Sequence, residues 1–388
     1  MKNKFLVLLL VVISILIISC DDTQQEGIVT SQTIDDEVGE SSDDAPEVTD
    51  ENKAEEKIVD IDEDETVDET EGKVDALVPS DEIVIDYQEV RPNEAGRVMV
   101  IMYHSLGEKE SYYVSTPDIL RKNLQDLYDR DYFLVSLKDF VNNSMDVPAG
   151  KTPVILTFDD GHRTNFNIIE ESGELTIDPD SAVGIIDNFY NEHPDFGRAA
   201  TFFLNSNISF SQIEHKTFKL NYLIENGYDL GSHSYGHEDL TALDGKGIQK
   251  TLGKNVQSIE SVLEDYTVNT LALPFGKRPK EPSLEKYVFE GVYEDETYEF
   301  IAVLNVGWNP TFAPIHKDFN YKSINRVQSG SGDFQLNYWI DYFDENPDKK
   351  YISDGVMEQI SVPKILEEKI DISTIGKKEL IIYERDLQ

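Results

Sequence analysis

The chain has 388 residues, enough for one large domain with appendages or for two domains of ordinary size. It carries 76 acidic and 34 basic side chains, which give a formal net charge of -42. Such a charge repels phosphate, so a nucleic-acid partner is excluded. The chain has 1 cysteine, which excludes an intrachain disulfide bond.

The N-terminus has the pattern of an export signal. Lys2 and Lys4 precede residues 5–18, a nearly continuous apolar run shorter than the roughly 17 to 25 residues of a membrane-spanning helix. Residues 17–20 (IISC) resemble a bacterial lipobox, in which cleavage leaves Cys20 as a diacylated N-terminus. An uncleaved anchor or a chance cysteine is the alternative. We therefore expect a lipoprotein signal peptide at 1–19 and an extracytoplasmic protein at the cell surface, lipid-anchored to the bacterial membrane through Cys20.

Residues 20–80 are predicted to be a disordered acidic linker. The part from 21 to 80 has 23 acidic and 3 basic side chains and no aromatic residue, so it cannot bury enough apolar surface to offset the entropy of folding. Binding of cations or of a partner by this acidic run is the alternative. With -20 in this segment and +2 from the two N-terminal lysines, the remaining residues 81–388 carry -24.

From residue 81 onward, predicted strands and helices alternate. Residues 115–118 (STPD) combine a capping hydroxyl, a proline in the first turn and a carboxylate that complements the helix dipole, so they predict a helix start. Apolar periodicity gives the other elements. Strands are predicted at 98–104, 133–135, 153–158, 199–204, 228–231, 270–273 and 300–304, and helices at 119–128, 137–141, 183–190, 220–225 and 248–263.

This alternation predicts an α/β fold built from parallel β/α units. An open doubly wound sheet and a barrel both fit, and we expect a distorted (β/α) barrel over residues 81–330. Both architectures place active sites at the C-terminal ends of the strands. The pattern changes after residue 330, where a helix and short strands predict a small C-terminal α+β extension over 331–388.

Carboxylates and imidazoles follow two of the predicted strands. Asp159 and Asp160 end the strand at 153–158, and adjacent carboxylates in one site indicate a cation that one binds while the other remains a free base. A solvated Asp-Gly turn is the alternative. His233 and His237 are four residues apart, so both imidazoles can reach one ion. Two histidines and one aspartate leave open positions for water and substrate, as in a hydrolytic metal site.

Three segments resemble the motifs of a known family. Residues 157–161 (TFDDG), 233–237 (HSYGH) and 273–276 (LPFG) are similar in order and spacing to the first three motifs of the polysaccharide deacetylases, carbohydrate esterase family four, homologous to nodulation-type chitooligosaccharide deacetylases. The resemblance extends from about residue 98 to 326. It implies a metal-dependent hydrolase that removes acetyl groups from N-acetylated sugars of a cell-envelope or extracellular polysaccharide. Zn²⁺ is the expected ion, with Co²⁺ or Ni²⁺ as alternatives.

The resemblance also implies roles for individual residues. Asp160, His233 and His237 would bind the metal, and Asp159 would be the general base. In the third motif, the turn that begins at Pro274 would direct the backbone N–H of Phe275 at the negative oxygen of the tetrahedral intermediate. A plain proline-glycine bend is the alternative for this turn.

The sequence departs from the family where a proton donor and an arginine are expected. Residues 323–327 (SINRV) replace the late histidine, so His104, at the end of the strand at 98–104, is the predicted general acid, as in exopolysaccharide-type members with permuted motifs. His316 and a purely structural His104 are the alternatives. No arginine precedes the third motif, and Arg326 and Lys277 are the candidates to orient the base. Trp308 is predicted to line the sugar pocket or to belong to the core.

Two other functions fit the same motifs. One is a non-catalytic glycan-binding lipoprotein with a deacetylase-like fold, and the other is an esterase that acts on O-acetylated glycans. In each case the expected partners are an acetylated polysaccharide or oligosaccharide and, through Cys20, the membrane. We expect a monomer.

Overall fold

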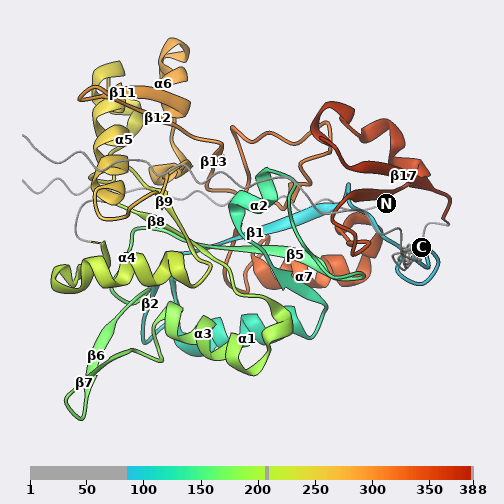
Figure 1. Ribbon diagram of the computed structural model, residues 1–388, viewed down its shortest axis with the longest axis horizontal. Coiled ribbons are helices and arrows are strands. Elements are labelled where there is room, and N and C mark those ends of the chain that lie inside the picture. Colours follow the sequence, from blue (N-terminus) through green and yellow to red (C-terminus); the bar gives the residue numbers. More distant parts are fainter. Residues whose placement is uncertain (1–84, 206–208, 386–388) are drawn as a thin grey trace, which may run out of the picture. The chain divides into compact units, whose positions relative to one another are not determined.

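The structure, a computed structural model, describes residues 85–205 and 209–385 (Figure 1). The predicted signal peptide, Cys20 and the acidic linker lie outside these residues. Within the described ranges, no helix is both long enough and apolar enough to cross a membrane.

A curled and mostly parallel β-sheet forms the centre of the described chain (Figure 1). Its order is β13-β10-β9-β8-β5-β1-β14, and only β14 runs antiparallel to its neighbour. All seven residues of β5 are buried, as the apolar run predicts. The strands are β1 (Arg97–Tyr103), β4 (Tyr132–Leu134), β5 (Thr152–Phe158), β8 (Thr201–Leu204), β9 (Asp229–Ser232), β10 (Thr270–Ala272), β13 (Ala302–Leu304), β14 (Thr311–Phe312) and β15 (Val327–Gln328).

The segment 321–328 connects the two sides of the curled sheet. Ile324 forms a parallel bridge with Leu304 of β13, and three residues later Val327 pairs with Ile101 of β1. The predicted α/β class and its distorted (β/α) barrel are thus confirmed. Arg326 lies on this segment, one residue before β15, which directs it at the C-terminal ends of β1 and β5.

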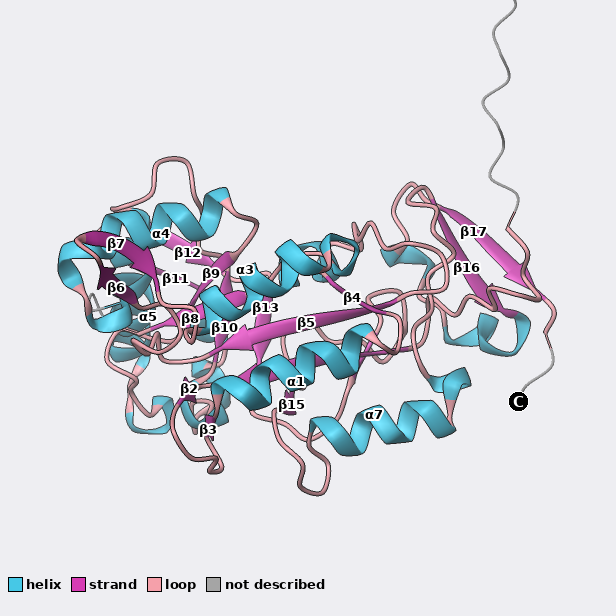
Figure 2. Ribbon diagram, turned by 90° about the horizontal axis from the view of Figure 1, so that it is seen from below, coloured by secondary structure: helices cyan, strands magenta, loops and turns pink. Residues whose placement is uncertain are grey.

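Helices cover the outside of the sheet, and their starts follow the predicted capping signals. Thr116 caps α1 by accepting a hydrogen bond from the N–H of Ile119 (3.2 Å), with Pro117 as the first helical residue. Figure 2 shows α1 and α3 along β5, and their apolar faces share the main core with that strand. The helices are α1 (Pro117–Tyr128), α2 (Leu137–Val141), α3 (Ala182–Glu192), α4 (Lys216–Glu225), α5 (Gly245–Glu260), α6 (Lys286–Phe289) and α7 (Leu336–Glu345).

Four small strand pairs extend from this framework, and the sequence patterns did not predict the first three. Two are antiparallel hairpins with two-residue turns in the left-handed region, Ser172-Gly173 and Glu294-Asp295. The pairs are β2 (Ser105–Leu106) with β3 (Val114–Ser115), β6 (Ile168–Glu171) with β7 (Glu174–Ile177), β11 (Glu290–Tyr293) with β12 (Glu296–Glu299), and β16 (Gln359–Pro363) with β17 (Glu379–Tyr383).

The C-terminal segment 331–388, as far as it is described, packs on the sheet. In α7, Leu336, Trp339, Ile340 and Phe343 are buried in the main core. Tyr351 donates its backbone N–H to the carbonyl of Arg97 at the start of β1 (3.0 Å). The predicted helix of this segment therefore belongs to the main core, whereas Ile360 and Val362 of β16 belong to a second core cluster that also contains Val98, Val100 and Ile155 of the barrel strands.

Candidate active site

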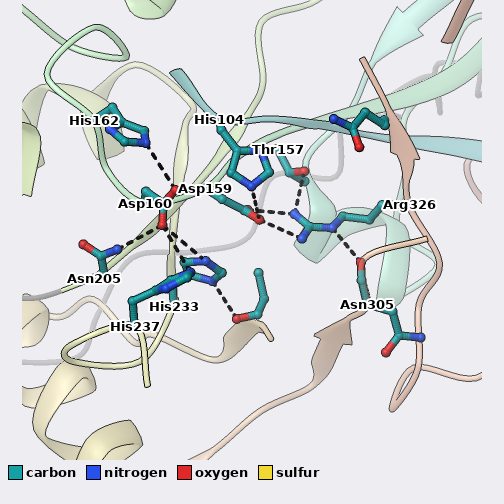
Figure 3. A network of polar contacts seen from close by, with 12 residues as sticks. His104, Thr157, Asp159, Asp160, His162, Asn205, His233, His237, Asn305 and Arg326 are labelled. Atoms are coloured by element: carbon teal, nitrogen blue, oxygen red, sulfur yellow. Dashed lines mark hydrogen bonds and ion pairs between the residues drawn. The ribbon is translucent and has the colours of Figure 1, made fainter. Parts of the chain in front are cut away.

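The two adjacent aspartates point to different neighbours (Figure 3). Asp159 directly follows β5 and is 1% exposed, whereas Asp160 has a φ of 72° and is partly exposed. A positive φ is uncommon for a non-glycine residue and costs on the order of 1–3 kcal/mol, which the surrounding contacts must offset. This turn separates the carboxylates, so that one faces Arg326 and the other faces two histidines.

Asp159 forms a bidentate ion pair with Arg326. Arg326 Nη1 donates to Asp159 Oδ1 (2.7 Å), and Nη2 donates to Oδ2 (2.8 Å). Arg326 is fully buried, and its Nε donates to the carbonyl of Asn305 (2.9 Å) while Nη1 also reaches Thr157 Oγ1 (3.2 Å). The guanidinium therefore holds both the position and the plane of the Asp159 carboxylate.

This ion pair keeps Asp159 ionised despite its burial. Burial is the largest single influence and would raise the pKa of Asp159. The charge of Arg326, the nearby His233 and the hydrogen bonds from Arg326 together outweigh burial, so the pKa of Asp159 lies well below its usual range. Each carboxylate oxygen retains lone-pair capacity beyond its bond to Arg326, so it can still accept a proton.

His104 directly follows β1 and, like Arg326, lies next to the carboxylate of Asp159. Its Nε2 is 3.8 Å from Asp159 Oδ2, and its side chain is 14% exposed. Burial lowers the pKa of His104, Asp159 opposes this effect and Arg326 adds to it. The ring of Tyr113 covers His104 at a centroid distance of 4.6 Å. The structure thus places the predicted proton donor beside the predicted base.

Asp160, His233 and His237 direct three potential ligand atoms at one point. Asp160 Oδ1 is 3.6 Å from His233 Nε2 and 3.5 Å from His237 Nε2, and the three atoms lie within 4.8 Å of one another. His233 Nδ1 is 2.8 Å from the carbonyl of Ala272, which can only accept, so Nδ1 carries the hydrogen and Nε2 presents its lone pair. One carboxylate oxygen and two imidazole nitrogens fit a divalent ion such as Zn²⁺.

Two further residues contact Asp160, and the sequence analysis did not identify them. His162 Nε2 is 3.2 Å from Asp160 Oδ2, and Asn205 donates to Oδ1 (3.1 Å). Burial tends to raise the pKa of Asp160, but the hydrogen bond from His162 and the nearby His233 outweigh it, so this pKa is lowered. Asn205 could have been found as a polar residue at a strand end, since it directly follows β8, whereas His162 lies in the loop after β5.

The third motif forms a single tight turn after β10. Pro274 is buried, and Phe275 has a φ of 59° and an exposed ring that packs edge-on against His237 at 4.4 Å. Since Phe275 is the second residue of this turn, its N–H has no partner within the turn. The turn is therefore strained at Phe275 and lies beside a candidate metal ligand.

The remaining candidates separate into those near the site and those away from it. Lys277 pairs with Asp239 (2.5 Å), so the structure brings Arg326 rather than Lys277 to Asp159. His316 stacks on Phe312, which pairs with the first residue of β1, so His316 lies at the opposite end of that strand from His104. Trp308 is 49% exposed and therefore does not belong to the core.

A cavity of about 260 Å³ connects the candidate base, the candidate proton donor and the candidate metal ligands. It is lined by both aspartates, by the histidines at 104, 162, 233 and 237 and by Ser105, and apolar side chains form the rest of its wall. A cavity that combines apolar wall residues with several convergent polar groups is typical of a ligand-binding site. The apolar part of the wall comes from Tyr113, Val114, Leu273, Phe275 and Val306.

Comparisons with known proteins agree with the motif resemblance for part of the chain. A family model described as polysaccharide deacetylase matches residues 146–287. No curated protein matches the chain. Among solved structures, a polysaccharide deacetylase from Bacillus cereus is 15% identical over 63% of this chain and 68% of that chain, with a TM-score of 0.46.

Two other similar structures differ in what their descriptions state. A Streptococcus pyogenes deacetylase in complex with acetate is 14% identical over 60% of this chain and 92% of that chain, with a TM-score of 0.44. A pseudoenzyme of carbohydrate esterase family four from Bacillus anthracis is 22% identical over 26% of this chain and 32% of that chain, with a TM-score of 0.21.

Proposed function

We propose that this protein is a metal-dependent hydrolase that removes acetyl groups from N-acetylated sugars of a polysaccharide. The observation that carries the proposal is that two adjacent carboxylates have different neighbours. Asp159 is held ionised by Arg326, and Asp160 faces two histidine nitrogens. A free base beside a three-ligand metal site is a combination that can hydrolyse an unactivated amide.

The metal would be held by Asp160 Oδ1 and by the Nε2 atoms of His233 and His237. When bound there, a divalent ion supplies Lewis acidity, which polarises a carbonyl oxygen and makes water more acidic. His162 would orient the Asp160 carboxylate, and the carbonyl of Ala272 would orient the His233 ring, through hydrogen bonds to atoms that do not bind the metal. Zn²⁺ fits this donor set best, since two imidazoles and one carboxylate are frequent ligands of catalytic zinc.

Asp159 and His104 would then handle the protons. Asp159 accepts a proton from the attacking water, and the C–N bond breaks once the amine nitrogen has received a proton. His104 is placed to supply this proton, because its Nε2 lies 3.8 Å from Asp159 Oδ2 in the same cavity. Since burial favours the neutral imidazole, His104 can pass on the proton that Asp159 has taken from water. Acetate and a free amine are the products.

The third motif would stabilise the negative oxygen that forms during attack. The N–H of Phe275 lies in a turn next to His237 and has no partner within that turn. A preorganised backbone N–H of this kind is typically worth on the order of 3 kcal/mol in the transition state. The positive φ of Phe275 is consistent with a backbone held in place for this purpose.

We also propose that the enzyme acts outside the cytoplasm. The support is the sequence alone: a basic start, an apolar run of signal-peptide length and a lipobox-like segment that ends at Cys20. The acidic linker would hold the catalytic domain away from the membrane surface. Resistance of the protein to release from membranes by high salt, and its release after Cys20→Ser, would test this location.

Acetate release from a panel of substrates tests the proposed activity. Peptidoglycan, poly-N-acetylglucosamine and chitin oligomers supply N-acetyl groups, and O-acetylated xylan tests esterase activity. We expect acetate from at least one N-acetylated glycan, loss of activity in excess chelator and recovery with Zn²⁺ or Co²⁺. Acetate release from O-acetylated xylan alone would make the protein an esterase. Glycan binding without acetate release under any metal would make it a binding protein.

A further inference from the structure

A series of exposed aromatic side chains leads away from the catalytic cavity. We call it the aromatic strip, and it consists of Tyr113, Tyr112, Trp308, Phe334 and Tyr338, which are 49, 45, 49, 48 and 38% exposed. A contiguous patch of exposed apolar side chains marks an interaction site more often than apolar side chains exposed singly do. Their concentration beside one cavity of an acidic protein therefore indicates a binding surface.

Ring contacts connect the first three side chains of the strip with the active site. Tyr113 lines the cavity and packs on His104, and Tyr112 meets Tyr113 edge-on at 4.7 Å. The ring of Trp308 lies 6.3 Å from Tyr112. Phe334 and Tyr338 form a second ring pair with a centroid distance of 4.9 Å, and Trp339 links this pair to the backbone of Trp308. The strip thus begins at the predicted proton donor and consists of a group of three rings and a group of two.

Buried contacts hold the three segments of the strip together. Trp339, which is 9% exposed, donates its Nε1 hydrogen to the carbonyls of Trp308 (2.8 Å) and Phe334 (3.2 Å). Gln328 of β15 donates to the carbonyl of Tyr112. Figure 2 shows β3, β15 and α7 in succession along one edge of the fold. The strip is therefore built into the fold rather than formed by one flexible loop.

We propose that the aromatic strip binds the sugar units that neighbour the unit being deacetylated, so that the enzyme prefers long glycan chains to short ones. This inference rests on the proposed function. A pyranose ring has an apolar C–H face and a polar edge, so an exposed aromatic ring can cover the face while the hydroxyl groups stay in water. Tyr and Trp suit this task because they offer a large rigid area at low conformational cost.

Other occupants fit the strip less well. An anionic membrane surface would be repelled by the net charge of -24 on residues 81–388. A second copy of the chain carries the same negative charge and would be repelled. The hydroxyl groups of Tyr112, Tyr113 and Tyr338 also make the strip less apolar than a typical dimer interface. An uncharged acetylated glycan meets neither obstacle. Continuity with the cavity places such a chain with one acetyl group at Asp159 and further units on the strip.

The test compares N-acetylglucosamine oligomers of two and six units. For the wild-type protein we expect kcat/KM to be higher for the hexasaccharide, and we expect Tyr112→Ala and Tyr338→Ala each to lower the hexasaccharide-to-disaccharide ratio about 3- to 10-fold. Tyr321→Ala is the matched control, because Tyr321 is also 45% exposed but lines a different cavity, with His316. This control should keep the wild-type ratio.

Binding measurements separate this inference from the proposed function. Calorimetric titration of hexasaccharide into Asp159→Asn, with and without Tyr338→Ala, reports the strip without turnover. The inference would be overturned if folded strip variants kept the wild-type hexasaccharide-to-disaccharide ratio of kcat/KM and the wild-type affinity for the hexasaccharide. If these variants still released acetate, the proposed function would stand. Loss of binding in these variants, with no acetate release from any N-acetylated glycan, would retain the strip and reject the deacetylase. A strip substitution that alters only self-association would also overturn the inference.

Discussion

Removal of Arg326 should expose the cost of a buried, unpaired Asp159. In Arg326→Met the apolar chain length is retained, but the bidentate contacts at 2.7 and 2.8 Å are lost. Breaking one partner of a buried ion pair typically costs 3–5 kcal/mol, because the other charge remains buried. We therefore expect the free energy of unfolding at pH 8 to fall by about 3–5 kcal/mol, measured by urea denaturation.

The pH dependence of this loss follows from the two opposing influences on Asp159. In the wild type, Arg326 keeps the pKa of Asp159 below its usual range, so the stability contributed by the ion pair is retained above that range and is lost only as pH falls through the lowered value. Without Arg326, burial dominates and raises the pKa, so protonation relieves the variant as pH falls. The stability difference between the two proteins should shrink from pH 8 to pH 5.

A surface ion pair supplies the control for this experiment. Arg130 Nε and Asp344 Oδ2 are 2.8 Å apart with side chains 34 and 46% exposed, so Arg130→Met should cost no more than about 1 kcal/mol. Asp159→Asn combined with Arg326→Met should recover part of the loss, because it removes the buried negative charge. A loss below about 1 kcal/mol for Arg326→Met that does not change with pH would refute the reasoning.

Three further predictions concern the proton donor, a buried carboxyl group and a helix cap. His104→Ala should lower kcat by about 10²- to 10⁴-fold at unchanged metal content, and His316→Ala should not; an unaffected kcat in His104→Ala would remove His104 as the acid. Burial, with Asp354 adding to it, raises the pKa of Glu94 to about 8, so the folded protein keeps this carboxyl group protonated at pH values where the unfolded chain loses the proton. Between pH 5 and pH 8 the wild type should therefore lose about 4 kcal/mol of stability relative to Glu94→Gln. Parallel urea titrations at both pH values test this, and equal pH slopes would contradict it. Thr116→Ala should lower the free energy of unfolding by about 1 kcal/mol through loss of the cap of α1, and an unchanged denaturation midpoint would show that the cap contributes nothing.

The sequence predicted local elements well where a local signal exists. The cap and proline at Thr116 and Pro117 gave the start of α1, and the apolar run before Asp159 gave β5. The hairpin turn at Ser172-Gly173 had a recognisable turn residue, whereas Glu294-Asp295 places two acidic residues in the left-handed region, which propensity does not predict.

Contacts between distant segments were harder to predict. Arg326 lies 167 residues from Asp159 in the sequence, and the sequence alone did not favour it over Lys277 as the residue that orients the base. Only the path of segment 321–328 between β13 and β1 brings it to Asp159. Asn205, which directly follows β8, and Tyr113, which directly precedes β3, reach the site without a motif of their own. The chemistry was therefore predictable where residues are adjacent in sequence, and the supporting shell required the fold.

Metal content measured beside acetate release in two single variants tests the central claim most directly. Asp159→Asn should retain a stoichiometric divalent ion and release no acetate, because it lacks the base but keeps the three ligand atoms. Asp160→Asn should lose both the ion and the activity. Near-normal turnover in Asp159→Asn, or full metal binding in Asp160→Asn, would contradict the division of roles between these two neighbouring carboxylates.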